Sequence, residues 1–204
     1  MTLGAHAEAS PARPMRLEDW ERLPEDEPGE LVGGVLVEEE VPSYVHEATV
    51  VWLMGLMLPW CRQNGARVIG SGLKFVLPNE SGRLPDLSLF LRGAPRPPAH
   101  GAARTPPSIA VEVVSSTPAD ARRDRIIKLS EYAEFGISWY WLVDPELRSV
   151  EILQLDSQRK YVHVVSATEG TVTEVPGCPG LSLPIDELWR ELDEAMAEAA
   201  EPTE

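Results

Sequence analysis

The chain has 204 residues, of which 43% are hydrophobic and 25% are charged, as in a globular domain that buries its core without disulfides. No apolar run reaches the roughly 20 residues that cross a membrane, and Cys61 and Cys178 form no paired motif. We therefore expect a cytoplasmic protein with free thiols and no membrane partner. The net charge of −15 and the pI of about 4.7 argue against strong non-specific binding to nucleic acid.

The negative charge is concentrated in two flanking segments. Residues 17–40 hold ten acidic residues and one basic residue, and residues 186–204 hold eight and one, which gives −9 and −7. Residues 41–185 hold fourteen of each sign and are neutral. We expect a disordered leader, a single domain and an acidic tail, over residues 1–14, 15–192 and 193–204.

The first half of the chain predicts a hairpin followed by a long helix. Residues 30–37 (ELVGGVLV) are typical of a β-hairpin, because a Gly-Gly pair supplies the positive φ of a tight turn. A helix is expected over residues 44–63, shortened or kinked by Pro59 and ended by Gly65. A short helix is expected over residues 16–23, strands over 67–69, 73–77, 87–91 and 109–114, and an exposed proline-rich loop over 92–107.

The second half predicts a strand–helix–strand connection. The Thr117-Pro118 pair should start a helix that runs to Phe135, and Gly136 should end it before a strand over residues 138–143. This connection implies a parallel pair of strands. A three-stranded meander is expected over residues 150–155, 161–165 and 171–175, and a final helix over residues 185–199. The fold class is therefore α/β, a mixed sheet flanked by helices, with an N-terminal hairpin extension.

Two carboxylates stand in apolar, strand-like runs. Asp86 opens PDLSLF at residues 85–90, and Glu112 lies inside IAVEVVS at residues 109–115. An unpaired charge is costly to bury because it loses its hydration. Two such carboxylates suggest a shared cation, and their oxygens suit Mg²⁺ or Mn²⁺. Asp86 could otherwise open a turn, and Glu112 could face solvent.

A basic side chain follows this pair in the chain. Lys128 stands four residues after Asp124 on one face of the predicted helix. The two residues form either an exposed ion pair or part of a buried site, and we expect the ammonium to lie near the Glu112 carboxylate. Such a lysine beside a cation site points to an anionic substrate and to metal-assisted hydrolysis of a phosphodiester. Glu30 is a candidate third acid, and the candidate substrate contacts are His46, Arg122 and Arg125.

Taken together, these motifs resemble the Uma-type restriction endonuclease family of the PD-(D/E)XK nuclease superfamily. The shared features are ELVGGVL at 30–36, Pro42, His46, PD at 85–86, VEVVSS at 111–116, Lys128, Tyr132, Gly136 and WYWLVDP at 139–145. The resemblance covers residues 17–192. It implies a restriction-endonuclease-like core, a DNA substrate, Mg²⁺ or Mn²⁺ as cofactor and a homodimer.

The resemblance also assigns roles residue by residue. Asp86 and Glu112 would be the metal-binding acids, and Glu30 a helper acid. The superfamily motif places its lysine two residues after the second acid, where this chain has Val114. In this family the lysine lies on the following helix, which implies that Lys128 takes that role.

Three functions are compatible with these residues. The leading prediction is an endonuclease that hydrolyses DNA through a metal-bound water held by Asp86 and Glu112, with Lys128 assisting. The alternative is a non-catalytic nuclease-fold protein that acts as a binding or interaction module. A glycosidase using the two carboxylates as acid and base is disfavoured, because only 6% of the residues are aromatic.

Overall fold

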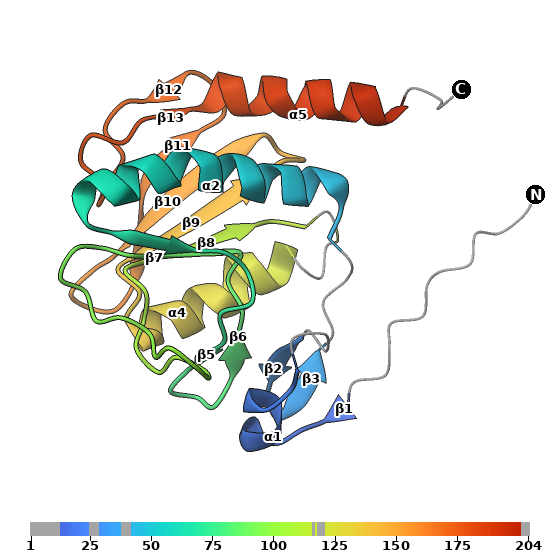
Figure 1. Cartoon of the computed structure of the whole chain (residues 1–204), viewed down its shortest axis with the longest axis vertical. Helices are drawn as coiled ribbons and strands as arrows, with labels where there is room; N and C mark the ends of the chain where they lie inside the picture. The colour runs from blue at the N-terminus through green and yellow to red at the C-terminus, as the bar shows by residue number, and fades with distance from the viewer. Residues whose placement is uncertain (1–12, 25–28, 38–41, 116, 118–120, 201–204) are drawn as a thin grey trace, which may run out of the picture.

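The computed structural model describes residues 13–24, 29–37, 42–115, 117 and 121–200. Its largest sheet is mixed and lies between helices (Figure 1). The order across this sheet is β11 (Tyr161–Ala167), β10 (Ser149–Leu155), β9 (Trp139–Asp144), β8 (Ile109–Val113), β7 (Leu87–Phe90) and β4 (Arg67–Ile69). Strands β8 and β9 are parallel and the other neighbours are antiparallel, so the predicted parallel pair is confirmed.

A smaller sheet carries the N-terminal part of the chain. Its order is β1 (Arg13–Pro14), β3 (Val35–Val37), β2 (Glu30–Val32), β6 (Gly82–Arg83) and β5 (Phe75–Val76). The predicted hairpin is confirmed, because β2 and β3 pair across Gly33 and Gly34, whose φ angles are 56° and 76°. Helix α1 (Leu17–Glu21) lies against this sheet, and its Trp20 is fully buried. Strand β1 falls at the end of the expected leader and pairs with Leu36 and Val35; residues 1–12 lie outside the described residues.

Helix α2 (Tyr44–Asn64) begins and ends at the predicted signals. The Ser43 hydroxyl accepts a hydrogen bond from the His46 amide at 3.1 Å, and Gly65 ends the helix with a φ of 69°. The expected shortening at Pro59 is wrong, because the helix continues to Asn64. Pro59 and Gly55 are both exposed, so the Gly55 carbonyl that loses its amide partner lies where water can reach it.

The connection from β8 to β9 contains a π-helical turn that the sequence did not predict. Residues 121–135 are helical, and within them η1 (Arg123–Lys128) forms the π turn before α4 (Leu129–Phe135). Gly136 ends the helix with a φ of 93°, as expected. The predicted start at Thr117-Pro118 lies largely outside the described residues.

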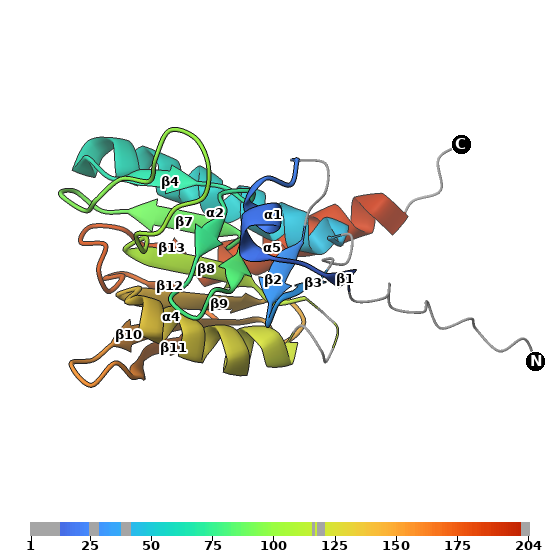
Figure 2. The same ribbon diagram turned by 90° about the horizontal axis from the view of Figure 1, so that it is seen from below.

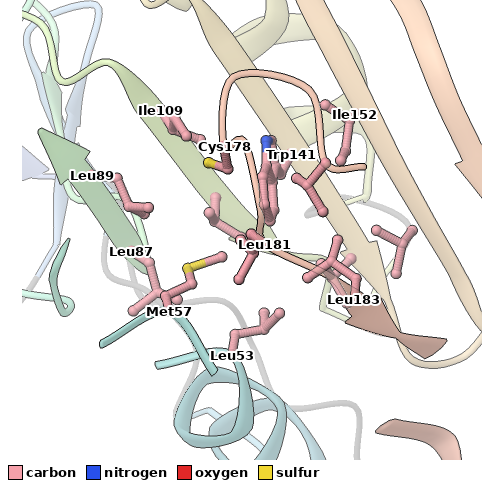
Figure 3. Close-up of a cluster of buried hydrophobic side chains, with 14 of the residues drawn as sticks. Leu53, Met57, Leu87, Leu89, Ile109, Trp141, Ile152, Cys178, Leu181 and Leu183 are labelled. Carbon is pink, nitrogen blue, oxygen red and sulfur yellow. The ribbon is translucent and has the colours of Figure 1, made fainter. Parts of the chain in front are cut away.

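The helices cover the two faces of the large sheet. Helices α2 and α5 (Ile185–Ala200) lie on one face and α4 lies on the other (Figures 1 and 2). The apolar core on the α2 and α5 side includes Leu53, Met57, Leu87 and Trp141 (Figure 3). The core on the α4 side is rich in aromatic side chains, among them Phe75, Phe90, Tyr132, Phe135 and Tyr140.

The prediction that residues 171–175 form the third strand of a meander is wrong. Residues 171–172 form β12 (Thr171–Val172), which pairs with β13 (Leu183–Pro184) and not with β11. The reason lies in the loop between them, whose Val175, Cys178 and Leu181 are buried in the core under α2 and α5. Within the described residues, no helix combines the length and the apolar character needed to cross a bilayer.

Candidate active site

Strands β7 and β8 bring two carboxylates to neighbouring positions at one end of the large sheet. Leu87 pairs with Val111 in the antiparallel ladder, so the next position along each strand sets Asp86 opposite Glu112. Asp86 precedes β7, and its Oδ2 accepts a hydrogen bond from the Val113 amide at 2.7 Å. Both acids therefore lie at the C-terminal end of β8, Glu112 within the strand and Asp86 next to it.

Glu112 is buried and both of its oxygens are engaged. The Tyr132 hydroxyl donates to Oε1 at 2.6 Å, and the Lys128 ammonium lies 3.0 Å from Oε2. Burial raises the pKa of Glu112 well above its ordinary range, and Asp86 and Asp124 raise it further, although Lys128 opposes them. Burial and the neighbouring acids thus both disfavour the charged form of Glu112.

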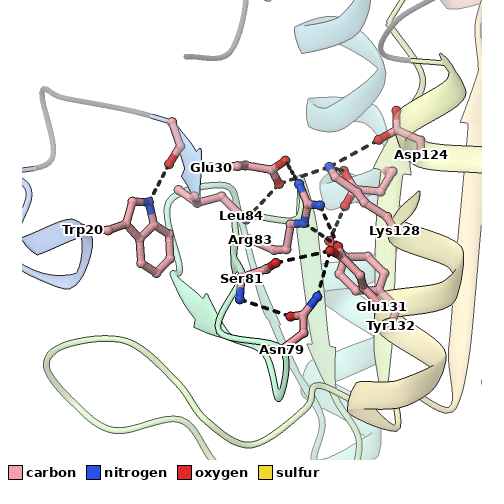
Figure 4. A network of polar contacts seen from close by, with 12 residues as sticks. Trp20, Glu30, Asn79, Ser81, Arg83, Leu84, Asp124, Lys128, Glu131 and Tyr132 are labelled. Carbon is pink, nitrogen blue, oxygen red and sulfur yellow. Dashed lines mark hydrogen bonds and ion pairs between the residues drawn. The ribbon is translucent and has the colours of Figure 1, made fainter. Parts of the chain in front are cut away.

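Lys128 joins three elements of the fold. Its Nζ lies 3.0 Å from Glu112 Oε2, 3.3 Å from Glu30 Oε1 and 3.3 Å from Asp124 Oδ1 (Figure 4). These partners come from β8, β2 and η1, and the lysine side chain is only 4% exposed. Burial lowers the pKa of Lys128, but the surrounding carboxylates, Glu112 first, raise it well above its usual value. The expected position of the ammonium near Glu112 is confirmed, and its pair with Asp124 is part of a buried site and not an exposed ion pair.

Glu30 reaches this cluster from the small sheet. Arg83 Nη1 donates to its Oε2 at 2.6 Å, and the Leu84 amide donates to its Oε1 at 3.3 Å. Burial raises the pKa of Glu30, but Lys128 and Arg83 outweigh that effect and hold it below its ordinary value. The structure therefore brings the predicted third acid to Lys128 and connects the N-terminal extension to the site.

Arg83 is a member of the cluster that sequence reasoning missed. It is fully buried, and besides Glu30 it binds Glu131 on α4, whose Oε2 accepts from Nε at 2.7 Å. Asn79 and Ser81 donate to the other oxygen of Glu131. The only available signal was a basic residue three positions before Asp86, and nothing in the local pattern marks it as buried.

The three candidate substrate contacts take different positions. His46 lies at the site, because its Nε2 is 3.4 Å from Asp86 Oδ2. Burial lowers the pKa of His46, but Asp86 and Glu47 reverse the shift and raise it. Arg125 pairs instead with Glu151 and with Asp144 Oδ2, the latter at 2.9 Å, away from the two acids. Arg122 is exposed and no described contact connects it to the site.

The donor set at the site is one of oxygens. Asp86 and Glu112 present carboxylates, whereas the described residues contain no group of three His, Cys, Asp or Glu side chains that could hold a metal ion. Mg²⁺ is commonly bound by one or two carboxylates, with water and phosphate oxygens completing its coordination. The two carboxylates, side by side on neighbouring strands, fit such a cation.

Comparison with known proteins identifies a matching family. A family model named Uma2, described as "Putative restriction endonuclease", matches residues 16–186. A search of curated proteins finds no match.

Two solved structures are similar to the chain. The crystal structure of a "putative nuclease belonging to DUF820" from Anabaena variabilis superposes with a TM-score of 0.66 at 20% identity, over 88% of this chain and 99% of that one. At this identity the likeness shows the fold, a mixed sheet flanked by helices, and not the activity. The type IIG restriction endonuclease BpuSI gives a TM-score of 0.37 at 17% identity over 79% of this chain and 18% of its own, too low to carry an argument.

Proposed function

The chain belongs to the Uma2 family, and on that basis we propose that it is a metal-dependent endonuclease that hydrolyses phosphodiester bonds of DNA. The observation that carries the proposal is the buried contact of 3.0 Å between Lys128 Nζ and Glu112 Oε2. Asp86 stands on the neighbouring strand, so two acids and one lysine from distant parts of the chain meet at one place. Carboxylates can hold the metal ion of such a reaction, and a fixed ammonium can stabilise the charge that develops on the phosphate.

Asp86 and Glu112 would hold Mg²⁺ or Mn²⁺. The bound cation would supply the chemistry of lowering the pKa of a water molecule and polarising the phosphate. The Tyr132 hydroxyl fixes Glu112 through Oε1, and the Val113 amide fixes Asp86 through Oδ2. Both carboxylates are therefore oriented by the protein before any cation binds.

Lys128 would supply positive charge to the phosphate. Negative charge grows on the phosphate oxygens as the bond to phosphorus forms, and a fixed ammonium in a site shielded from water stabilises it. Glu30 and Asp124 hold that ammonium at 3.3 Å each, so they act as positioning residues. His46 beside Asp86 is placed to contact the substrate or to orient the acid.

One observation favours the non-catalytic alternative. Both oxygens of Glu112 already have partners in Tyr132 and Lys128, as in a cluster that serves only stability. The homodimer that the resemblance implies stays a prediction, which sedimentation of the purified chain can test.

Cleavage of supercoiled plasmid and of single-stranded DNA tests the proposal. We expect nicking in Mg²⁺ or Mn²⁺ that EDTA stops and that Asp86→Ala and Glu112→Gln abolish. Glu146→Gln is the matched control, because Glu146 is exposed and lies outside the cluster. A folded protein that cleaves no DNA with either metal, or whose cleavage survives both substitutions at the site, would favour the binding module.

A further inference from the structure

Two stretches of this acidic chain contain no acidic residue. Residues 48–79 and 87–111 hold no Asp or Glu, although the whole chain has 33. The same stretches contain six basic residues, listed here in order: Arg62, Arg67, Lys74, Arg92, Arg96 and Arg104. Residues 41–185 are neutral in total, but their acidic residues are therefore distributed very unevenly along the chain.

The fold brings four of these arginines together at the C-terminal end of α2. Arg62 lies in the last turn of α2, and Arg67 opens β4 two residues after the helix ends. Arg67 Nη1 donates to the Ala66 carbonyl at 2.9 Å, and Arg96 Nη2 donates to the Gly65 carbonyl at 3.1 Å. A Cβ built on Gly65 would lie 3.6 Å from the Arg92 side chain. All four therefore lie around Gly65 and Ala66.

No carboxylate neutralises these four arginines within the described part of the chain. The other two basic residues of the stretches are already engaged, since Lys74 donates to the Trp20 and Leu23 carbonyls and Arg104 pairs with Glu21. All four arginines at the end of α2 are exposed. Arg67 and Arg96 donate to the Ala66 and Gly65 carbonyls, just beyond the last residue of α2. Arg62 and Arg92 have no hydrogen bond or ion pair among the described residues, and both side chains are exposed.

We propose that Arg62, Arg67, Arg92 and Arg96 form a second DNA contact, a tract that binds the phosphate backbone away from the acids. The choice of DNA rests on the proposed nuclease function. Guanidinium groups bind phosphate oxygens through paired donors, and such contacts position a duplex without reading its sequence. The tract explains how a chain with a net charge of −15 can hold a polyanion.

The tract lies at the opposite end of β7 from the candidate active site. Asp86 precedes this strand and Arg92 follows it, a span of six residues or about 20 Å at about 3.3 Å per residue. The two ends of α2, with His46 near its start and Arg62 near its end, also lie on opposite sides of the molecule in Figure 1. A span of about 20 Å corresponds to about six base pairs of duplex at about 3.4 Å each. The tract would therefore contact DNA several base pairs from the bond that is cut.

Fluorescence anisotropy of labelled duplexes in EDTA tests the tract without requiring cleavage. The variant Arg62→Gln/Arg92→Gln removes two exposed charges. It leaves in place the hydrogen bonds that Arg67 and Arg96 donate to the Ala66 and Gly65 carbonyls. The control Arg148→Gln/Arg190→Gln loses the same charge from residues that pair with Asp193 and with Glu187 and Glu194. Binding is measured for a 30-base-pair duplex and for a hairpin with a stem of 4 base pairs across a series of salt concentrations.

The tract variant should bind the 30-base-pair duplex at least tenfold more weakly at low salt. Its slope of log affinity against log salt should be smaller by about 2, because two phosphate contacts are lost at about 0.9 each. The hairpin stem, about 14 Å long at about 3.4 Å per base pair, cannot span both regions and should show a smaller loss, and the control should match the parent on both.

Three results would overturn the tract: a parent that binds no duplex, an equal loss in the control, or binding to anionic phosphatidylserine vesicles but not to DNA. Arginine-dependent binding by a protein that never cleaves would support the tract and reject the nuclease. If the parent cleaves DNA but the Arg62→Gln/Arg92→Gln variant binds DNA as the parent does, the nuclease is supported and the tract is rejected.

Discussion

Tyr132 illustrates how single hydroxyl groups set the geometry of the site. Its O–H is the only hydrogen-bond donor to Glu112 Oε1 among the described residues, and both side chains are buried. Leaving a buried acceptor without a donor costs about 1–3 kcal/mol. The bond also restricts which way the carboxylate faces, so its loss should affect chemistry as well as stability.

We expect Tyr132→Phe to lower the free energy of unfolding by about 1–3 kcal/mol and to lower metal-dependent cleavage. Tyr161→Phe is the matched control, because it removes a partly buried hydroxyl that donates to the Ile137 carbonyl at 2.8 Å, away from the acids. Urea unfolding and plasmid cleavage are measured for both variants. If Tyr132→Phe and Tyr161→Phe lose the same amount of cleavage, Tyr132 contributes to stability only.

Glu30 should make the protein dependent on pH. Its pKa lies below the ordinary value in the folded state, so its ionised form stabilises the fold above the unfolded value of about 4.3 and that contribution is lost as the pH falls below it. Glu30→Gln leaves Lys128 and Arg83 each one carboxylate short. We expect it to cost about 3 kcal/mol at pH 7, with the difference from the parent shrinking below pH ~4.

Unfolding by urea from pH 3 to pH 7 measures this difference. Glu146→Gln, an exposed substitution, should track the parent at every pH. A Glu30→Gln difference that stays constant with pH would show that ionisation of Glu30 contributes nothing to stability.

Sequence reasoning at the residue scale found the charges that stand in apolar runs and missed those that do not. Glu112 was recognisable because a carboxylate among valines needs a partner, and Lys128 because it completes a motif. Arg83 lies in a short turn-like segment of glycine, proline and small polar residues, where a basic residue is usually exposed. Its burial follows from the small sheet that folds over α4, which no local pattern reveals.

At the scale of elements, the small sheet depends on close packing between α1 and β6. A Cβ built on Gly82 would lie 2.5 Å from the Trp20 ring, so only glycine allows this approach. The Trp20 indole N–H donates to the Gly29 carbonyl at 2.8 Å, next to Glu30. The contact therefore helps hold β2 and its glutamate in place.

We expect Gly82→Ala to destabilise the fold by about 1–3 kcal/mol through overpacking and to weaken cleavage through displacement of Glu30. Gly55→Ala should act in the opposite direction, since Gly55 lies inside α2 and a Cβ there meets no atom within 4 Å. Alanine in a helix interior is favoured over glycine by about 0.5–1 kcal/mol. Thermal unfolding of both variants tests the pair, and a stable Gly82→Ala would contradict the packing argument.

Elements with strong local signals were predictable, and those fixed by tertiary contacts were not. Helix α2 has a cap, a stop and apolar spacing, and β8 to β9 has the pattern of a crossover. By contrast, β12 has the composition of a meander strand but pairs with β13, because the loop between them buries its apolar residues under α2 and α5. Whether β12 pairs with β11 or with β13 depends on where the apolar residues of the following loop are buried, and a local sequence pattern does not contain that information.

At the scale of the whole molecule, charge is segregated along the chain. The C-terminal helix α5 is acidic, whereas the acid-free stretches meet at the C-terminal end of α2. The charge totals of flanks and body were readable from sequence, but the arginine tract was not, because its members are separated by up to 34 positions. Their proximity depends on α2, β4 and β7 meeting at one end.

Deleting residues 197–204 should strengthen DNA binding at low salt, because it removes Glu198, Glu201 and Glu204. The cut leaves the buried Leu192 and the pairing of Asp193 with Arg148 intact, so folding should be unchanged. Anisotropy with a 30-base-pair duplex should show the gain at low salt and its disappearance at high salt. A triple substitution of these glutamates by glutamine should reproduce it, and weaker binding in either variant would refute the repulsion.

The π turn has a consequence for how related sequences are aligned. A π turn holds one residue more than the α-helix would need, so residues on its two sides are out of helical phase by one position. Removing Ile126, which is 60% exposed, would rotate the residues that precede the π turn by about 100° about the helix axis relative to those of α4. A relative with the same motif letters but one residue fewer between β8 and α4 would therefore build a different site. The length of this interval, counted residue by residue, is as much a part of the motif as its acids and its lysine.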